Sequence, residues 1–268
     1  MNSGSPSIRE FDPGFQIQFD PQSFRFTYGA DVFGPATPEL RHLNDVRASL
    51  KDPKCDGPDP LYAIAMDVGR NVDAVELRSR MLLYGVVAYA KGRVGVEPVR
   101  SQGHVHAVAP HCGWSTPELV EIWEGKAIIY LQQKVADDAG LCVAIEAKPG
   151  DVVVIPPAWA HCIINADPER EMVFGAFCDR EYGFEYAEIR RRGGLAWFAE
   201  YGDGNRLEWN PNPAYTDSTL EFRSARRYPE FHLDEKRPIY EQFTSDPGRF
   251  QWISAPGMFS ELWQSFQP

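Results

Sequence analysis

Short apolar runs separated by turn residues fill the middle of this chain, and they restrict its fold more than any other feature. Glycine and proline stand between most of the runs. Many short strands punctuated in this way are typical of antiparallel barrels and jelly rolls. The sequence therefore predicts an all-β fold, with strands at 61–68, 75–84, 85–90, 95–106, 118–123, 127–132, 141–147, 151–155, 162–165 and 171–177.

Four side chains within this region have the types and the spacing of a metal site. His104 and His106 are two positions apart on a predicted strand, so both imidazoles point to one face. Glu118 opens a later run, and His161 lies in another. Three imidazoles and one carboxylate suit a divalent transition metal and leave coordination positions for water or substrate. We therefore predict that these four residues bind a metal.

The spacing resembles the two signatures of the cupin superfamily. The first is His-x-His followed later by a Glu, six residues and a Gly, and Glu118 with Gly125 satisfies it. The second is a Gly, five residues, a Pro, a His five positions on and an Asn four positions further, which Gly150, Pro156, His161 and Asn165 satisfy. The resemblance implies a single cupin (jelly-roll) barrel with one metal. The alternative is a barrel of this type that has lost its metal.

The remainder of the chain is predicted to surround this barrel. We assign residues 1–214 to one barrel domain and residues 215–268 to a C-terminal extension. Residues 1–36 read as an extended arm that pairs with a sheet. Thr37 before Pro38 predicts a helix from there to about Leu50. A second helix is predicted to end at the three arginines 190–192, just before two glycines.

The extension is predicted to cover an apolar surface. It follows an Asn-Pro-Asn-Pro linker at 210–213 and has no second His-x-His, so we expect one barrel and not two. Its aromatic and aliphatic residues are expected to pack on the barrel or on a partner subunit; they are Trp252, Phe259, Leu262, Trp263 and Phe266. Because the arm and the extension could cover exposed sheet edges, we expect a homodimer.

Composition narrows the class of function. The formal net charge of -11 argues against nucleic acid, although a small phosphorylated ligand needs only a local cluster of donors. Residues 1–20 lack the features of a secretory signal, and the longest apolar run, 82–90, reads as a buried strand and not as a membrane span. Five cysteines without CxxC spacing favour reduced thiols and a cytoplasmic location. Cys162 is expected in the core, on the opposite side of its strand from His161.

More specifically, the chain resembles the cupin-type glucose-6-phosphate isomerases of archaea and some bacteria. The matching segments are Gly103–Ala107, Glu118–Gly125, Pro156–His161 with Asn165, and Gly183–Tyr186. The resemblance covers roughly residues 40–213. It implies that His104, His106, Glu118 and His161 bind the metal, that Ser101 and Gly103 bind substrate, and that Tyr186 belongs to the active-site pocket. Val120 and Phe184 depart from the tyrosine and the histidine of the smaller archaeal members, which affects the phosphate contacts more than the metal.

This resemblance implies an aldose-ketose isomerase that interconverts glucose 6-phosphate and fructose 6-phosphate, by an enediol(ate) or a hydride shift. Fe²⁺ is the favoured metal, with Mn²⁺, Zn²⁺ and Ni²⁺ as alternatives. Glu118 is the expected base, and Tyr186 is expected to orient a hydroxyl or assist ring opening. The alternatives are that Glu118 is only a metal ligand and that Tyr186 is a packed aromatic residue of the pocket wall. The rival functions are a metal-dependent dioxygenase and a non-enzymatic sugar-binding cupin. His111 is expected on an exposed loop, with a lid residue as the alternative.

Overall fold

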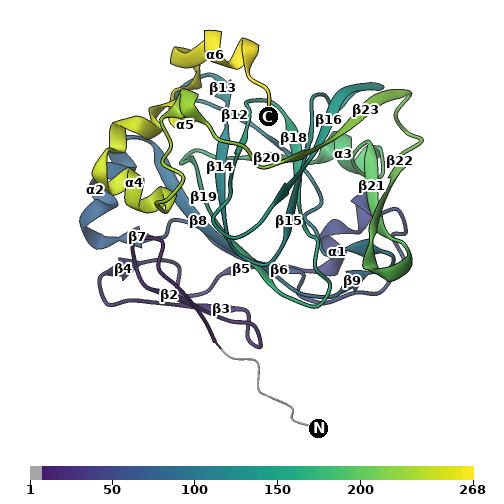
Figure 1. Ribbon diagram of the computed structural model, residues 1–268, viewed down its shortest axis with the longest axis horizontal. Helices are drawn as coiled ribbons and strands as arrows, with labels where there is room; N and C mark the ends of the chain where they lie inside the picture. The colour runs from purple at the N-terminus through teal and green to yellow at the C-terminus, as the bar shows by residue number, and fades with distance from the viewer. Residues whose placement is uncertain (1–7) are drawn as a thin grey trace.

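Two β-sheets face each other at the centre of the protein, whose computed structural model describes residues 8–268 (Figure 1). The first sheet has the order β17 (Val152–Ile155), β14 (Glu118–Glu124), β19 (Met172–Asp179), β8 (Leu82–Tyr89), β6 (Tyr62–Ala65), β5 (Glu39–Arg41). The second has the order β18 (Ala160–Asn165), β15 (Ala127–Gln132), β16 (Asp138–Ala147), β23 (Asp217–Ser224). The expected all-β jelly roll is confirmed, as two open sheets and not as a barrel closed by hydrogen bonds.

Alternation along the strands divides the apolar residues into separate layers. On β14, Val120 and Ile122 face the core between the two sheets, whereas Leu119 faces the outer side of the six-stranded sheet. Successive strand residues point to opposite faces, so a strand covered on both sides is apolar at nearly every position. All eight residues of β19 are buried for this reason.

The N-terminal arm packs mainly on a face of the barrel and not along an edge. Its strands β1 (Arg9–Phe11), β2 (Ile17–Asp20) and β3 (Arg25–Tyr28) form a sheet of their own. Ile17 and Phe19 are buried from this sheet against the outer side of the six-stranded sheet. Only β4 (Val32–Phe33) pairs with a strand outside the arm, β7 (Gly69–Arg70). The expected pairing of the arm with a sheet is therefore wrong for most of its length.

Three sequence predictions of secondary structure are wrong. The predicted strand at 95–106 is interrupted, because only β10 (Glu97–Pro98) and β11 (Val105–His106) are strands within it. The predicted helix at 37–50 is instead β5 followed by α1 (Leu43–Val46) and the 3-10 turn η1 (Arg47–Ser49). Pairing of β5 with β6 stabilises the strand, and the helix starts only after His42, whose backbone N–H donates to the Asp45 carboxylate. The predicted strand at 75–84 begins as the 3-10 turn η2 (Asn71–Asp73) and α2 (Ala74–Ser79), on which Leu77 is buried and Val75 is exposed.

The C-terminal segment covers the outer side of the six-stranded sheet beside the arm, on the left of Figure 1. Its helical turns follow one another along the chain: η4 (Pro229–Phe231), α4 (Ile239–Ser245), η5 (Pro247–Phe250), α5 (Gln251–Ser254), η6 (Pro256–Phe259) and α6 (Ser260–Ser265). Tyr240, Phe243 and Trp252 are buried there. β23 also lies beyond residue 214, yet it completes the four-stranded sheet, so the segment outside the two sheets begins after Ser224.

The four-stranded sheet has a smaller cover on its outer side, formed by α3 (Ala187–Arg191), β21 (Trp197–Tyr201) and β22 (Leu207–Pro211). α3 ends before Gly193, as predicted, and Arg191 and Arg192 pair with Glu188 one turn back. The remaining short elements are β9 (Arg93–Val94), β10 (Glu97–Pro98), β11 (Val105–His106), β12 (Val108–Ala109), β13 (Trp114–Ser115), β20 (Phe184–Glu185) and η3 (Asp203–Asn205). Within residues 8–268, no helix has the length and apolar character needed to cross a membrane.

Candidate metal centre

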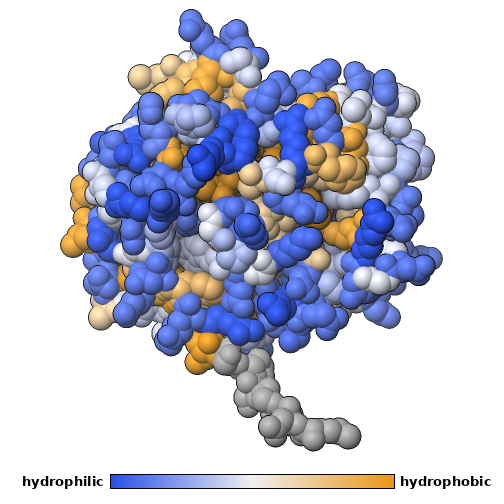
Figure 2. Space-filling model, in the orientation of Figure 1, coloured by the Kyte–Doolittle hydropathy of each residue, from blue (hydrophilic) through white to orange (hydrophobic). Residues whose placement is uncertain are grey.

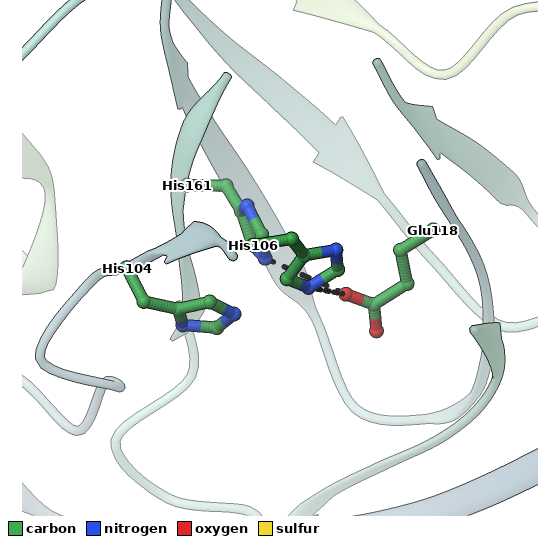
Figure 3. Close-up of side chains that lie close together, drawn as sticks. All are labelled: His104, His106, Glu118 and His161. Atoms are coloured by element: carbon green, nitrogen blue, oxygen red, sulfur yellow. Dashed lines mark ion pairs between the residues drawn. The ribbon is translucent and has the colours of Figure 1, made fainter. Parts of the chain in front are cut away.

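The four predicted ligands converge between the two sheets (Figure 3). Glu118 is the first residue of β14, His161 lies on β18, and His104 and His106 come from the segment around β11. One ligand atom from each residue lies within 4.8 Å of the other three. In Figure 3 the three imidazoles and the carboxylate point toward a common centre. The structure therefore brings together residues that are up to 57 positions apart in the sequence.

Backbone hydrogen bonds hold two of the ligands side by side. The N–H of His104 donates to the carbonyl of His161 at 3.0 Å, and the N–H of His161 donates back to the carbonyl of His104 at 2.9 Å. Gly103 precedes this pair with a φ of +85°, and a Cβ there would lie 2.8 Å from Leu195 Cδ1. The chain therefore requires glycine at this turn, so that His104 reaches its position beside His161.

Hydrogen bonds on the far side of the rings orient the imidazoles. His106 Nδ1 lies 2.8 Å from the Thr116 carbonyl, and His161 Nδ1 lies 3.3 Å from the Trp159 carbonyl. A carbonyl only accepts, so Nδ1 carries the proton in both rings and Nε2 keeps its lone pair. The Nε2 atoms of His104 and His161 are buried without a hydrogen-bond partner in the described part of the chain. Such buried, unpartnered nitrogens fit a metal at the centre of the group.

Electrostatics give the group the protonation states that a metal requires. Burial lowers the pKa of His104 well below its ordinary value, and the charges of His161, His106 and Arg41 lower it further. Burial also lowers the pKa of His161. Burial acts to raise the pKa of Glu118, but the adjacent rings of His106 and His161, whose Nε2 atoms lie 3.4 Å from Oε2, outweigh it and lower the pKa to about 2. Neutral imidazoles and an ionised carboxylate are the forms that ligate metals.

A cavity opens in front of the ligands, and most of the predicted substrate residues face it. Ser101 and Tyr186 line it together with the four ligands. The Ser101 hydroxyl accepts a hydrogen bond from the Ile163 N–H at 3.2 Å, which fixes the side chain against β18. The Tyr186 ring centroid is 5.9 Å from that of His104. Gly103 is not part of the cavity wall within residues 8–268, and its place is in the turn that leads to His104.

The cavity wall also contains residues that the sequence analysis did not assign to the site. They are Arg41, Tyr62, Ile64, Met66, Gly85, Val87, Tyr89, Gln102, Ile163, Phe174, Ala176 and Cys178. Arg41 was missed because the segment at 37–50 was read as a helix, which hid the strand that carries it. Most of the others lie on β6, β8 and β19. Strand alternation predicts which of their residues face the interior, but it does not predict which of these line the cavity.

Phe184 and Val120, at which the chain departs from the smaller archaeal enzymes, lie in different parts of the structure. Phe184 lines the cavity, and its ring centroid is 4.4 Å from that of His104 and 5.8 Å from that of His106. An apolar ring thus packs against two ligands. Val120 is buried in the core between the sheets and does not line the cavity in the described structure.

Two further residues from the sequence analysis lie outside the ligand group. His111 lies on the exposed turn between β12 and β13, as predicted, and its Nε2 lies 2.7 Å from the carboxylate of the fully buried Asp179. Cys162 is buried in the layer behind β18, as predicted. All five cysteines, at positions 55, 112, 142, 162 and 178, are free thiols.

Two facing sheets with three histidines and one glutamate converging between them define a cupin-type protein with a candidate metal centre. The model of the glucose-6-phosphate isomerase (GPI) family matches residues 41–215, and the chain belongs to this family. The matched range begins with Arg41 on β5 and includes all four ligands.

Individual relatives agree with this assignment at modest identity. The glucose-6-phosphate isomerase of Thermococcus gammatolerans is 31% identical over 136 residues, which cover 51% of this chain and 67% of the relative. That of Pyrococcus abyssi is 26% identical over 176 residues, or 65% of this chain and 87% of the relative. A solved structure of oxalate oxidase aligns with 46% of this chain and 54% of its own at 15% identity, with a TM-score of only 0.33.

Proposed function

We propose that this protein is a metal-dependent isomerase that interconverts glucose 6-phosphate and fructose 6-phosphate. One observation carries the proposal: His104, His106, Glu118 and His161 converge on one cavity in a chain of the glucose-6-phosphate isomerase family. Two orphaned Nε2 atoms in that group support a metal at its centre.

The proposed cofactor is one divalent transition metal per subunit, with Fe²⁺ favoured over Mn²⁺, Zn²⁺ and Ni²⁺. Imidazole and carboxylate ligands suit each of these ions. When bound, the ion supplies positive charge that neutralises the negative charge developing on the sugar oxygens at C1 and C2. The four ligands hold it, and the nearly complete burial of His106 and His161 keeps bulk water away from it.

Glu118 is proposed to move the proton between C1 and C2. Its Oε2 lies 3.4 Å from the Nε2 atoms of both His106 and His161, so Oε1 is the atom proposed to accept the proton. A pKa of about 2 makes Glu118 a weak proton acceptor, which keeps a hydride shift as the alternative. Tyr186 is proposed to orient a sugar hydroxyl or assist ring opening, and Ser101 to contact the substrate from β18.

A coupled assay that converts fructose 6-phosphate to glucose 6-phosphate tests the proposal. Purified protein should be active, lose activity with a chelator, and regain it when a divalent metal is added back. Absence of turnover in fully metal-loaded protein would refute the isomerase. Oxygen uptake by the same preparation would support a dioxygenase in its place, because three histidines and one glutamate also suit iron and oxygen chemistry.

We further propose a cytoplasmic homodimer. Five free thiols suit a reducing compartment. β23 lies at an edge of the four-stranded sheet, and Phe222 on this strand is 65% exposed, so a second subunit would cover an apolar edge. Sedimentation at micromolar concentration tests the assembly, and a monomer under these conditions would contradict it.

A further inference from the structure

One cation faces the cavity, and neither the metal nor the proton transfer uses it. Among the cavity-lining residues in the described structure, Arg41 is the only lysine or arginine. We propose that Arg41 binds the phosphate group of the sugar phosphate and so sets the preference for phosphorylated substrates. This inference rests on the isomerase function proposed above.

Arg41 keeps hydrogen-bonding capacity for a ligand beside its contacts with Glu39 and with the hydroxyls of Tyr62 and Tyr186. Within residues 8–268 its one carboxylate partner is Glu39, which is 53% exposed and two positions away on β5. An ion pair this exposed contributes little to stability. A guanidinium has five N–H donors in a planar fork, and that fork matches two phosphate oxygens at once. Arg41 is 23% exposed, so it is accessible to a ligand and still partly shielded from water.

The position of Arg41 suits the far end of a six-carbon sugar. β5 is four places along the sheet from β14, which carries Glu118, so the two side chains enter the cavity from different sides. Tyr186 connects these sides. The centroid of the Tyr186 ring is 5.9 Å from that of His104. Burial raises the pKa of Tyr186, and Arg41 is close enough to oppose this by lowering it. Substrate held at C1 and C2 by the metal centre would direct C6 toward Arg41.

Charge gives the second argument. The protein has a formal net charge of -11, so its long-range field repels a phosphate dianion. A cation inside the cavity offsets that repulsion where the phosphate would bind. Arg190 does not fill this role, because it is exposed, donates to Gln102 Oε1 at 2.8 Å and lies over the Tyr186 ring at 5.0 Å. It supports the cavity wall from outside, whereas Arg41 faces the interior.

Arg41→Gln tests the proposal, with Arg180→Gln as the matched control. Arg180 is 21% exposed, pairs with the single carboxylate of Asp67 and lies outside the described cavity wall. For Arg41→Gln, KM for fructose 6-phosphate should rise about 10- to 100-fold, the usual effect of losing charge-assisted hydrogen bonds. The turnover number should change less than about 3-fold, because the phosphate is remote from C1 and C2. Arg180→Gln should leave both constants near those of the wild type.

Calorimetry with inorganic phosphate separates this proposal from the isomerase itself. Metal-loaded wild-type protein and the Arg180→Gln variant should bind phosphate at least about 10-fold more tightly than Arg41→Gln. If Arg41→Gln binds phosphate as tightly as the wild type, or keeps its KM in an active enzyme, the phosphate site is refuted and the isomerase stands. If the wild type lacks turnover but binds phosphate through Arg41, the isomerase fails and the anion site stands.

Discussion

The two faces of β14 place chemically identical side chains in opposite environments. Glu118 faces the cavity among imidazoles, which hold its pKa at about 2. Glu121, three residues on, lies under the C-terminal segment, where burial raises its pKa to about 7 against hydrogen bonds from the Trp123 indole and the Ile239 N–H. Strand alternation decides which face each occupies. The charge state of a buried carboxylate on β14 therefore depends on which face of the sheet it occupies. Its position along the chain gives little indication of that charge state.

The largest expected effect is at the cavity face. His161→Ala should abolish metal binding, because it removes a ligand that is 1% exposed and held by its backbone to His104. Elemental analysis measures the metal content. His111→Ala is the control, since that ring pairs with Asp179 away from the ligands and the metal content should stay unchanged. Full metal content in His161→Ala would rule out the assigned ligand set.

Substitutions on the outer face of the six-stranded sheet should change the stability of the protein. Trp252→Ala removes a ring that is 1% exposed and stacked 4.1 Å from Phe231, so the free energy of unfolding should fall by about 3–5 kcal/mol. Chemical denaturation measures this change. Met258→Ala, in the same segment but 78% exposed, should change it by less than about 0.5 kcal/mol. Equal effects of the two substitutions would mean that the C-terminal segment does not pack on the barrel in solution.

Turnover should distinguish the two carboxylates. Glu118→Gln keeps the shape and one oxygen ligand but removes the proton acceptor, so turnover should fall about 100-fold even after metal is restored. Glu121→Gln makes the same change on the other face of β14 and should leave turnover unaltered. Full activity in metal-loaded Glu118→Gln would mean that Glu118 is only a metal ligand and that another residue is the base.

The smallest effect concerns pH and the outer face. Because the pKa of Glu121 is raised from 4.5 to about 7, the folded protein holds a proton that the unfolded chain releases first. The stabilisation is complete below pH 4.5 and is lost as the pH rises through 7, a change of about 3 kcal/mol. Glu121→Gln should remove this dependence and be the more stable protein at pH 8. Parallel stability curves for the two proteins from pH 5 to 8 would show that Glu121 is ionised throughout.

Local patterns predicted part of this structure, and pairing between distant segments determined the rest. The strand at 127–132 has the predicted bounds, because turn residues flank a continuous apolar run. The His-x-His pair and Glu118 were found because strand periodicity and motif spacing are local properties. Residues 39–41 look helical in isolation, but their pairing with β6 makes them a strand. No local signal states that pairing, so Arg41 could not be placed in the cavity from the sequence.

The paired backbones of His104 and His161 also bear on how the proposed metal would be acquired. Reciprocal backbone hydrogen bonds fix the positions of these two residues, and such bonds need no metal to form, so the proposed metal would be loaded into a chain that is already folded. A site that is already formed accepts whichever suitable ion is present, with an order of affinity set by the ion and not by folding. The metal recovered from a purified preparation should therefore vary with the supply in the expression host. Two laboratories growing the same protein in different media should obtain different ions in the same fold.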